Sequence, residues 1–326
     1  SFITYKLTGG ETFITDTSNA SRTMLFNINT LSWDEKLLKK FGIPKQILPQ
    51  VVSNGKQLAT AHTKLGDMPI GSILGDQQSS LFGQGCFDKG LAKATYGTGC
   101  FILSNTGDHP IHNKKMLSTI AWTINGKTTY ALEGSIFNAG TVVNWLIDDL
   151  QVLTSNKVSS EISNNLQDTN GVYFVPAFTG MGAPYWKTYA KGAIVGLTRS
   201  ANKNHIIRAG LESMAYNTYD IIKCMEEEEN VKIKELRVDG GVSRNEFLMQ
   251  FQSDILGKKV IKSGSSECTV LGTIYMTALA LGYVGGLKDI KELIETSKVY
   301  TSKMNNRQRQ ELLENWHLAV KQTLGD

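Results

Sequence analysis

The stretch LAKATYGTGCFILSNTG, residues 91–107, decides the fold class of this chain of 326 residues. It contains two strand-like runs separated by the turn Gly97-Thr98-Gly99. Two further strand-like runs follow, and Asn125-Gly126 between them is a strong signal for a tight hairpin turn. The stretch and its continuation to Glu133 therefore predict consecutive antiparallel strands.

Beyond these strands the pattern alternates between helices and strands. Apolar residues recur every three to four positions from Ile136 to Leu150 and from Ile207 to Met225, which is typical of amphipathic helices. The runs GVYFVPAF, GAIVGLT, KELRVDGG and KKVIKS are typical of strands, and further helices are expected over residues 245–256, 266–281 and 306–324. Antiparallel strands followed by alternating helices and strands predict an α/β fold with a mixed sheet flanked by helices.

The N-terminal part of the chain is less regular. SFITYKLTGG alternates apolar and polar residues and predicts a strand at residues 1–10, and a short apolar run predicts a buried strand at residues 70–76. Between them, NTLSWDEKLLKKFGIP predicts a helix that ends at Gly42. Asn29, Thr30 or Ser32 is expected to cap it.

Composition excludes several classes of protein. The net charge is only +4, and no cluster of Lys and Arg is interleaved with aromatic residues, so nucleic acid is not expected as a partner. The longest weakly polar run, Gly272 to Gly286, is shorter than the roughly 20 residues that a membrane-spanning helix needs. The four cysteines are scattered without a C-x-x-C pair, which favours a reducing cytoplasm over a disulfide framework or a zinc site.

Asp76 follows Gly75 at the start of a segment that can form a helix, in SILGDQQSSLFGQG. Asp is among the best N-cap residues, so helix capping accounts for it. A catalytic carboxylate is the alternative, and the local sequence does not separate the two.

Three glycine-bearing stretches add candidates for phosphate or nucleotide binding. At Gly97-Thr98-Gly99, glycine backbone and a Thr hydroxyl suit a terminal phosphate, and a plain hairpin turn is the alternative. In AGTVVNW, Gly140 and Asn144 lie one helical turn apart and offer a flat polar wall, with tight helix packing as the alternative.

The third stretch, VDGGVSRNEF, contains the end of an expected strand followed by Gly240-Gly241 and a helix near Asn245. Ligands of open α/β sheets bind beyond the carboxyl ends of strands, and helix N-termini favour anions. A tight turn with Ser243 or Asn245 as helix cap is the alternative. Combined with Asp76, the three stretches supply what phosphoryl transfer needs, namely positioned phosphates and a carboxylate that deprotonates an attacking hydroxyl.

Seven motifs span nearly the whole chain in order: DTSNASRTMLFNI (16–28), GDQQSSLFGQ (75–84), ATYGTGCFILSNTG (94–107), STIAW (118–122), PAFTGMGAPYW (176–186), GLTRSANKNHIIRAGLES (196–213) and VDGGVSRNEFLMQFQSDIL (238–256). Together they resemble the FGGY family of carbohydrate kinases, in particular its members that phosphorylate glycerol. The resemblance implies an actin-like ATPase fold, related to ribonuclease H, with two lobes and a cleft between them.

The resemblance also implies how the chain is divided. Residues 1–84 correspond to the C-terminal tail of the N-terminal FGGY lobe, and residues 85–326 to the C-terminal nucleotide-binding lobe. The N-terminal part of the family's first lobe, with its first phosphate loop, has no counterpart in this sequence. We therefore expect the chain to be part of a longer protein and to be inactive by itself.

The implied reaction is transfer of the γ-phosphate of ATP to glycerol, giving sn-glycerol 3-phosphate, with Mg²⁺ as cofactor. The implied partners are glycerol, ATP and ADP, without nucleic acid or a membrane span, in a cytoplasmic homo-oligomer. By position, Asp76 matches the catalytic base, and glycerol contacts match Asp76, Gln77 and Phe101. Nucleotide contacts match Gly97, Thr98, Gly140, Asn144, Gly241 and Asn245, and no metal ligand is assigned within this chain.

Two alternatives stay open. One is another sugar kinase of the same family, of the xylulose or gluconate type. The other is a nucleotide-binding module without catalysis.

Overall fold

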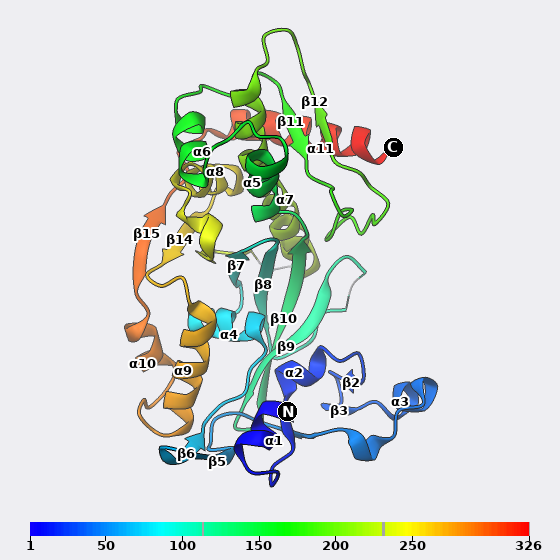
Figure 1. Ribbon diagram of the computed structural model, residues 1–326, viewed down its shortest axis with the longest axis vertical. Coiled ribbons are helices and arrows are strands. Elements are labelled where there is room, and N and C mark those ends of the chain that lie inside the picture. The colour runs from blue at the N-terminus through cyan, green and yellow to red at the C-terminus, as the bar shows by residue number, and fades with distance from the viewer. Residues whose placement is uncertain (113, 230–231, 326) are drawn as a thin grey trace.

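The computed structural model describes residues 1–112, 114–229 and 232–325. At its centre the described residues form a seven-stranded sheet in the order β15-β14-β13-β7-β8-β10-β9 (Figure 1). Strand β13 pairs in parallel with β7 and β14, and the other neighbours are antiparallel. The strands are β7 (Leu91–Tyr96), β8 (Cys100–Gly107), β9 (Leu117–Ile124), β10 (Lys127–Ile136), β13 (Glu235–Asp239), β14 (Lys259–Ser263) and β15 (Thr296–Tyr300). The mixed sheet confirms the predicted α/β fold class.

The antiparallel half of the sheet follows the prediction from the sequence. Strands β7 and β8 pair on either side of the Gly97-Thr98-Gly99 turn, and β9 and β10 pair on either side of Asn125-Gly126. Asn125 has a φ of 49° and Gly126 a φ of 78°. A type I′ turn requires this left-handed backbone at both central positions, which is why Asn-Gly favours it.

Alternate side chains of the central strands enter two hydrophobic clusters on opposite faces of the sheet, as the period of a strand requires. Ile102 of β8 and Leu132 of β10 belong to the larger cluster, whereas their neighbours Leu103 and Ala131 belong to the smaller one. Side chains of α7 and α8 complete the larger cluster, and side chains of α4 and α9 complete the smaller one. The sheet is therefore flanked by helices on both faces (Figure 1).

The helices of residues 76–325 are α4 (Asp76–Gly83), α5 (Gly140–Asn144), α6 (Asn156–Asn164), α7 (Lys203–Glu229), α8 (Glu246–Leu256), α9 (Cys268–Ala280), α10 (Leu287–Leu293) and α11 (Asn306–Leu324). A π-helical turn (Trp145–Asp149) follows α5, a 3-10 turn (Gly241–Arg244) precedes α8, and strands β11 (Tyr173–Val175) and β12 (Ala193–Val195) form a separate pair. Helices α5, α6, α7, α8 and α11 gather at one end of the molecule, whereas α9 and α10 lie along its side (Figure 1).

Helices α4 and α9 approach each other so closely that only glycine fits at the contact. A Cβ atom on Gly83 of α4 would lie 2.1 Å from the carbonyl oxygen of Cys268, and one on Gly272 of α9 would lie 1.9 Å from that of Ser79. The hydroxyl of Ser79 also donates to the carbonyl of Thr269, at 2.6 Å. This contact holds α4 between the sheet and α9.

The N-terminal elements form a smaller region beside β9 and β10, at the other end of the molecule from α11 (Figure 1). They are α1 (Phe2–Leu7), β1 (Ile14–Asp16), α2 (Thr17–Ser21), β2 (Phe26–Asn27), β3 (Ser32–Trp33), α3 (Glu35–Phe41), a 3-10 turn (Lys45–Ile47), β4 (Gln50–Val52), β5 (Ala59–Thr63) and β6 (Gly66–Ile70). Helix α2 attaches this region to the large sheet, because Thr17 and Ser21 hydrogen-bond to Thr123 and Thr119 of β9.

Two predicted strands of this N-terminal region were wrong. Residues 1–10 contain helix α1, and Ile3, Tyr5 and Leu7 are exposed, so no buried face enforces a strand there. Residues 71–75 are irregular, and the preceding strand β6 is largely exposed. A short apolar run has no fixed period, so it does not distinguish a strand from an extended loop segment.

Two boundaries and several short elements also differ from the prediction. Helix α3 is capped by Asp34, not by Asn29, Thr30 or Ser32, because the Asp34 carboxylate accepts the N–H groups of Lys36 and Leu37. Ile136 ends strand β10 and does not begin a helix. The sequence analysis missed α2 and β1 to β5 in the N-terminal region, and α6, α10 and β15 beyond it. Elements this short depend on tertiary packing more than on local propensity.

Asp220 of α7 joins the C-terminal helix to the rest of the molecule. Its buried carboxylate accepts hydrogen bonds from the Tyr185 hydroxyl at 2.8 Å and from the Trp316 indole at 2.7 Å, and it pairs with Nε2 of His317 at 2.8 Å. The hydrogen bond to Asp220 raises the pKa of His317 above its usual value, while burial and the nearby Lys321 oppose the shift.

We predict that this pairing makes stability depend on pH. A His whose folded-state pKa is raised contributes stability that is complete below its unfolded pKa of about 6.5 and is lost as pH rises through the folded pKa. The melting-temperature difference between the wild type and His317→Gln should therefore be larger at pH 6 than at pH 9. A melting-temperature difference that is the same at pH 6 and at pH 9 would show that protonated His317 does not stabilise α11.

We also predict that Gly272→Ala destabilises the protein by about 1–3 kcal/mol or more, because the added methyl group meets backbone that cannot move aside cheaply. Gly286→Ala is the control, since Gly286 has an extended backbone and a Cβ there would meet no described atom within 4 Å. That variant should change the free energy of unfolding by no more than about 0.5 kcal/mol in urea titrations. Equal effects of the two substitutions would contradict the close contact.

Candidate active site

Asp76 is the first residue of α4, and Gly75 holds the N-cap position. The Asp76 carboxylate is exposed, and it accepts the backbone N–H of Gln77 at 2.7 Å and the Gln77 side-chain amide at 3.3 Å. The capping interpretation of Asp76 was therefore wrong, since a capping carboxylate accepts from the second or third helical residue, as Asp34 does. The helix N-terminus stabilises negative charge at this position.

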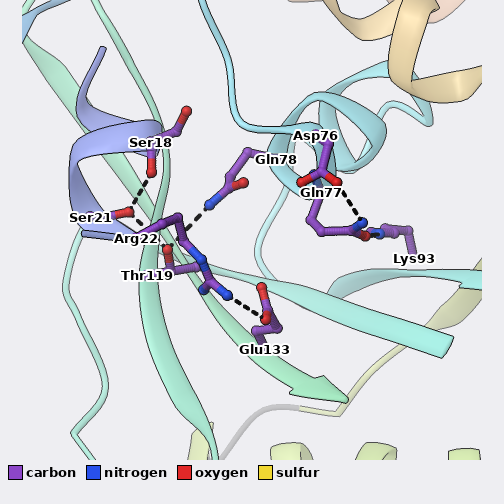
Figure 2. A network of polar contacts seen from close by, with 9 residues as sticks. All are labelled: Ser18, Ser21, Arg22, Asp76, Gln77, Gln78, Lys93, Thr119 and Glu133. Atoms are coloured by element: carbon purple, nitrogen blue, oxygen red, sulfur yellow. Dashed lines mark hydrogen bonds and ion pairs between the residues drawn. The ribbon is translucent and has the colours of Figure 1, made fainter. Parts of the chain in front are cut away.

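A buried lysine lies behind Asp76. The side chain of Lys93, in β7, is fully buried, and its ammonium donates to the amide oxygen of Gln77 and to the hydroxyl of Thr95, the latter at 3.0 Å. Burial lowers the pKa of Lys93, and the negative charge of Asp239 opposes this shift. Figure 2 shows Asp76, Gln77 and Lys93 side by side.

An ion pair crosses from the N-terminal region to the sheet. The guanidinium of Arg22 pairs with Glu133 of β10 at 2.8 Å, and the Glu133 side chain is only 1% exposed (Figure 2). Next to it, the amide of Gln78 donates to the hydroxyl of Thr119 at 3.2 Å. Helix α2 and helix α4 thus both contact β9, and Arg22, which follows α2, pairs with β10.

The turn between β7 and β8 packs on the start of α5. The N–H of Gly140 donates to the carbonyl of Gly97 at 3.0 Å, and that of Ala139 donates to the carbonyl of Thr98 at 3.0 Å. A Cβ on Gly140 would lie 2.5 Å from the Gly97 oxygen. Gly140 is therefore the first residue of its helix and not an interior one. Gly97 and Thr98, in the turn that packs against it, are exposed.

The Gly240-Gly241 turn lies beside the same strand end. Gly240 has a φ of 88°, and a Cβ there would lie 2.3 Å from the carbonyl oxygen of Tyr96, the residue before Gly97. Gly241 is exposed and lines a cavity of about 520 Å³ together with Lys157, Ser160, Glu161, Arg244, Asn245 and Glu246. The structure therefore brings the three glycine stretches together at the carboxyl ends of β7 and β13.

The remaining predicted site residues differ in whether their side chains are free to contact a ligand. Asn245 is the N-cap of α8: its amide oxygen accepts the N–H of Leu248 at 3.0 Å, and its amide nitrogen donates to Ser159 at 3.0 Å. Phe101 of β8 lies opposite Thr95 and is partly exposed. Asn144 is exposed at the end of α5 and is not among the described residues that line the cavity.

Sequence reasoning missed three charged residues of the site, Arg22, Lys93 and Glu133. Lys93 and Glu133 lie within strand-like runs whose other residues are mostly apolar or small. A charge at a buried strand position requires a partner or a function. That rule could have identified Lys93 and Glu133 as candidate site residues, but the sequence does not identify their partners.

The mixed sheet flanked by helices has the actin-like ATPase fold, with a helix-terminal carboxylate at Asp76 and glycine turns at the ends of β7 and β13. The FGGY family of carbohydrate kinases matches the chain twice, with its C-terminal domain over residues 92–281 and its N-terminal domain over residues 1–83. The chain belongs to the FGGY family of carbohydrate kinases.

Among curated relatives, glycerol kinase 1 of Clostridium tetani is 48% identical over 326 residues, 99% of this chain and 66% of that protein. A glycerol kinase of Listeria monocytogenes is 48% identical over 98% of this chain and 65% of that protein. The chain thus spans about two thirds of the length of these relatives.

Solved structures agree on the fold. The crystal structure of Plasmodium falciparum glycerol kinase with ADP has a TM-score of 0.94 and 37% identity, covering 99% of this chain and 65% of that one. A ligand-bound xylulose kinase from Lactobacillus acidophilus has a TM-score of 0.87 over 99% of this chain and 66% of that one, and at 24% identity it supports the fold alone. In the described part of this chain, no helix is both long and apolar enough to cross a membrane.

We predict that Arg22→Met destabilises the protein by about 1–3 kcal/mol, because it leaves the buried Glu133 carboxylate without its ion-pair partner. Arg22→Met combined with Glu133→Gln should recover part of that loss, since the unpaired charge is then removed. Urea unfolding of the two variants measures this. A double variant less stable than Arg22→Met would contradict the assignment of the ion pair.

Proposed function

We propose that the protein containing this chain transfers the γ-phosphate of ATP to glycerol and releases sn-glycerol 3-phosphate and ADP. The observation that carries the proposal is the hydrogen-bonded path from the exposed Asp76 carboxylate through Gln77 and Lys93 to Thr95, two residues before Gly97. It joins a candidate base to a candidate phosphate turn. Glycerol as acceptor is supported by the 48% identity to proteins named glycerol kinase.

In the proposed mechanism, the Asp76 carboxylate accepts the proton of the terminal glycerol hydroxyl as that oxygen attacks the γ-phosphorus. The new O–P bond forms, the bond from the γ-phosphorus to the β–γ bridging oxygen breaks, and ADP leaves. Gln77 and Phe101 contact glycerol, Gln77 through its amide and Phe101 through its ring against the carbon edge. The exposed Asp76 side chain and the partly exposed Phe101 ring are accessible to a ligand.

The nucleotide is proposed to bind across the three glycine stretches. The exposed backbone of Gly97 and the Thr98 hydroxyl hold the γ-phosphate, where glycine permits close approach. The cavity of about 520 Å³ beside Gly241 is in the size range of small-molecule sites and takes the adenosine part. Asn245 lines this cavity beside Gly241, and Gly140 and Asn144 are proposed to form the wall at α5.

Magnesium is proposed to enter with the nucleotide. Within residues 1–112, 114–229 and 232–325, no group of three or more His, Cys, Asp or Glu side chains is placed to hold a metal ion. Mg²⁺ is commonly held by substrate phosphates with only one or two carboxylates, and it neutralises phosphate charge there. This chain therefore does not need a metal cage of its own for the proposed reaction.

The proposed division of the chain is 1–84 as the end of the first lobe and 85–326 as the second lobe. It is supported by the change from small two-stranded sheets to the large sheet between β6 and β7. A cytoplasmic location is also proposed, because all four cysteines are buried and unpaired, as is usual in a reducing compartment.

We predict that Asp76→Ala lowers kcat for glycerol phosphorylation by about 10²–10⁴-fold, as expected for loss of a general base, while KM for ATP changes little. Because Asp76 is not an N-cap, the free energy of unfolding should change by no more than about 1 kcal/mol, the usual upper effect of a charge at a helix N-terminus. Initial rates from ADP release and urea unfolding measure the two effects.

Asp34→Ala is the matched control for Asp76→Ala. It removes a true capping carboxylate and should lower stability by about 0.5–2 kcal/mol with kcat unchanged. If Asp76→Ala behaved like Asp34→Ala, with lost stability and intact turnover, Asp76 would not be the base.

A further inference from the structure

Lys93 lies on the hydrogen-bonded path between Asp76 and Thr95, but the proposed mechanism gives this buried cation no role of its own. Its side chain is 0% exposed on the α4 face of β7, while its neighbours Ala92 and Ala94 enter the cluster on the other face. Among the ion pairs of the described residues, none includes Lys93. Burying an ammonium without a direct ion pair is unfavourable, and an apolar side chain would fill the same space at lower free energy.

The two hydrogen bonds of Lys93 determine how Gln77 is oriented. An ammonium is only a donor, so the Gln77 group that faces Lys93 is the amide oxygen. The amide nitrogen then faces Asp76 and donates to its second carboxylate oxygen at 3.3 Å, while the first accepts the Gln77 backbone N–H at 2.7 Å. Both carboxylate oxygens of Asp76 thus accept hydrogen bonds from Gln77. The hydrogen bond from Lys93 holds the Gln77 side chain with its amide nitrogen toward Asp76 (Figure 2).

A second chain of hydrogen bonds joins Lys93 to Asp239, the residue before the Gly240-Gly241 turn. The single hydroxyl proton of Ser80 is donated to Asp239, at 3.3 Å, so Thr95 is the donor in its hydrogen bond to Ser80, at 3.1 Å, while it accepts from Lys93. Asp239 immediately precedes Gly240-Gly241. A single direction of donation therefore runs from β7 through α4 to the end of β13, and the Asp239 charge stabilises the ammonium electrostatically.

We propose that Lys93 is a positioning residue of the phosphoryl-transfer site, which holds Gln77 in the one amide orientation that donates to Asp76. This inference rests on the proposed function of Asp76. Without Lys93, the Gln77 amide oxygen loses its donor and the amide is free to turn away from Asp76, so the carboxylate loses the second donor that orients it toward the acceptor hydroxyl.

The test is Lys93→Met, which keeps the length of the side chain and removes the donor. We expect kcat/KM for glycerol to fall by about 10- to 100-fold through misplacement of the base, with KM for ATP within about twofold of the wild type. The control is Lys258→Met, since Lys258 is a largely buried lysine paired with Glu226 at 2.8 Å, away from this network. That variant should lose stability without changing kcat/KM for glycerol.

A double-mutant cycle with Gln77→Leu tests whether Lys93 acts through Gln77. If it does, the double variant should be about as impaired as the more impaired single variant, whereas independent roles would multiply the losses. If Lys93→Met does not fold, Lys93→Met with Asp239→Asn replaces it in the cycle, because that pair removes both charges. Multiplied losses, or lowered stability with unchanged kcat/KM, would overturn the inference.

The activity of the wild type on glycerol distinguishes a failure of this inference from a failure of the proposed function. A wild-type protein that does not phosphorylate glycerol overturns the proposed function and the role of Lys93 with it. An active wild type whose kcat/KM for glycerol is insensitive to Lys93→Met overturns only the role of Lys93.

Discussion

The close contact between α4 and α9 is the constraint on which the rest of the site depends. Gly83 and Gly272 let the two helix backbones approach to a distance that any side chain would prevent. With α9 on one side and the sheet on the other, α4 has little freedom to shift, because well-packed interiors do not deform continuously. The N-terminus of α4, and Asp76 with it, is therefore held at a defined place relative to β7.

Hydrogen bonds between α4 and β7 also hold Asp76 in place. Gln77 and Ser80 are three residues apart on α4 and contact Lys93 and Thr95, two residues apart on β7. Helical and strand periods make this pairing possible, since positions one turn apart on a helix share a face, as do alternate positions on a strand. The glycine turns after β7 and β13 then add a second set of contacts, in which Gly240 touches Tyr96 and Gly140 touches Gly97. A candidate acceptor site and a candidate nucleotide site thus share one strand.

Much of the large sheet could be predicted from the sequence, whereas the tertiary contacts of the site could not. The antiparallel strands followed from their alternation and from Asn125-Gly126, and α7 from its long apolar period. The α4–α9 contact joins positions far apart in the sequence, as in the hydrogen bond from Ser79 to Thr269, 190 residues away, and no local pattern encodes such a pair. For the same reason, the sequence analysis missed Lys93, whose partner Gln77 lies 16 residues away on another element.

The central claim, that this site phosphorylates glycerol, is tested most directly by acceptor preference. Initial rates of ADP release by the protein that contains this chain, with glycerol, D-xylulose or gluconate as the acceptor, give kcat/KM for each. The account predicts the highest value for glycerol and formation of sn-glycerol 3-phosphate in step with ADP. A higher value for the pentulose or for gluconate, or ADP release without a phosphorylated acceptor, would contradict it.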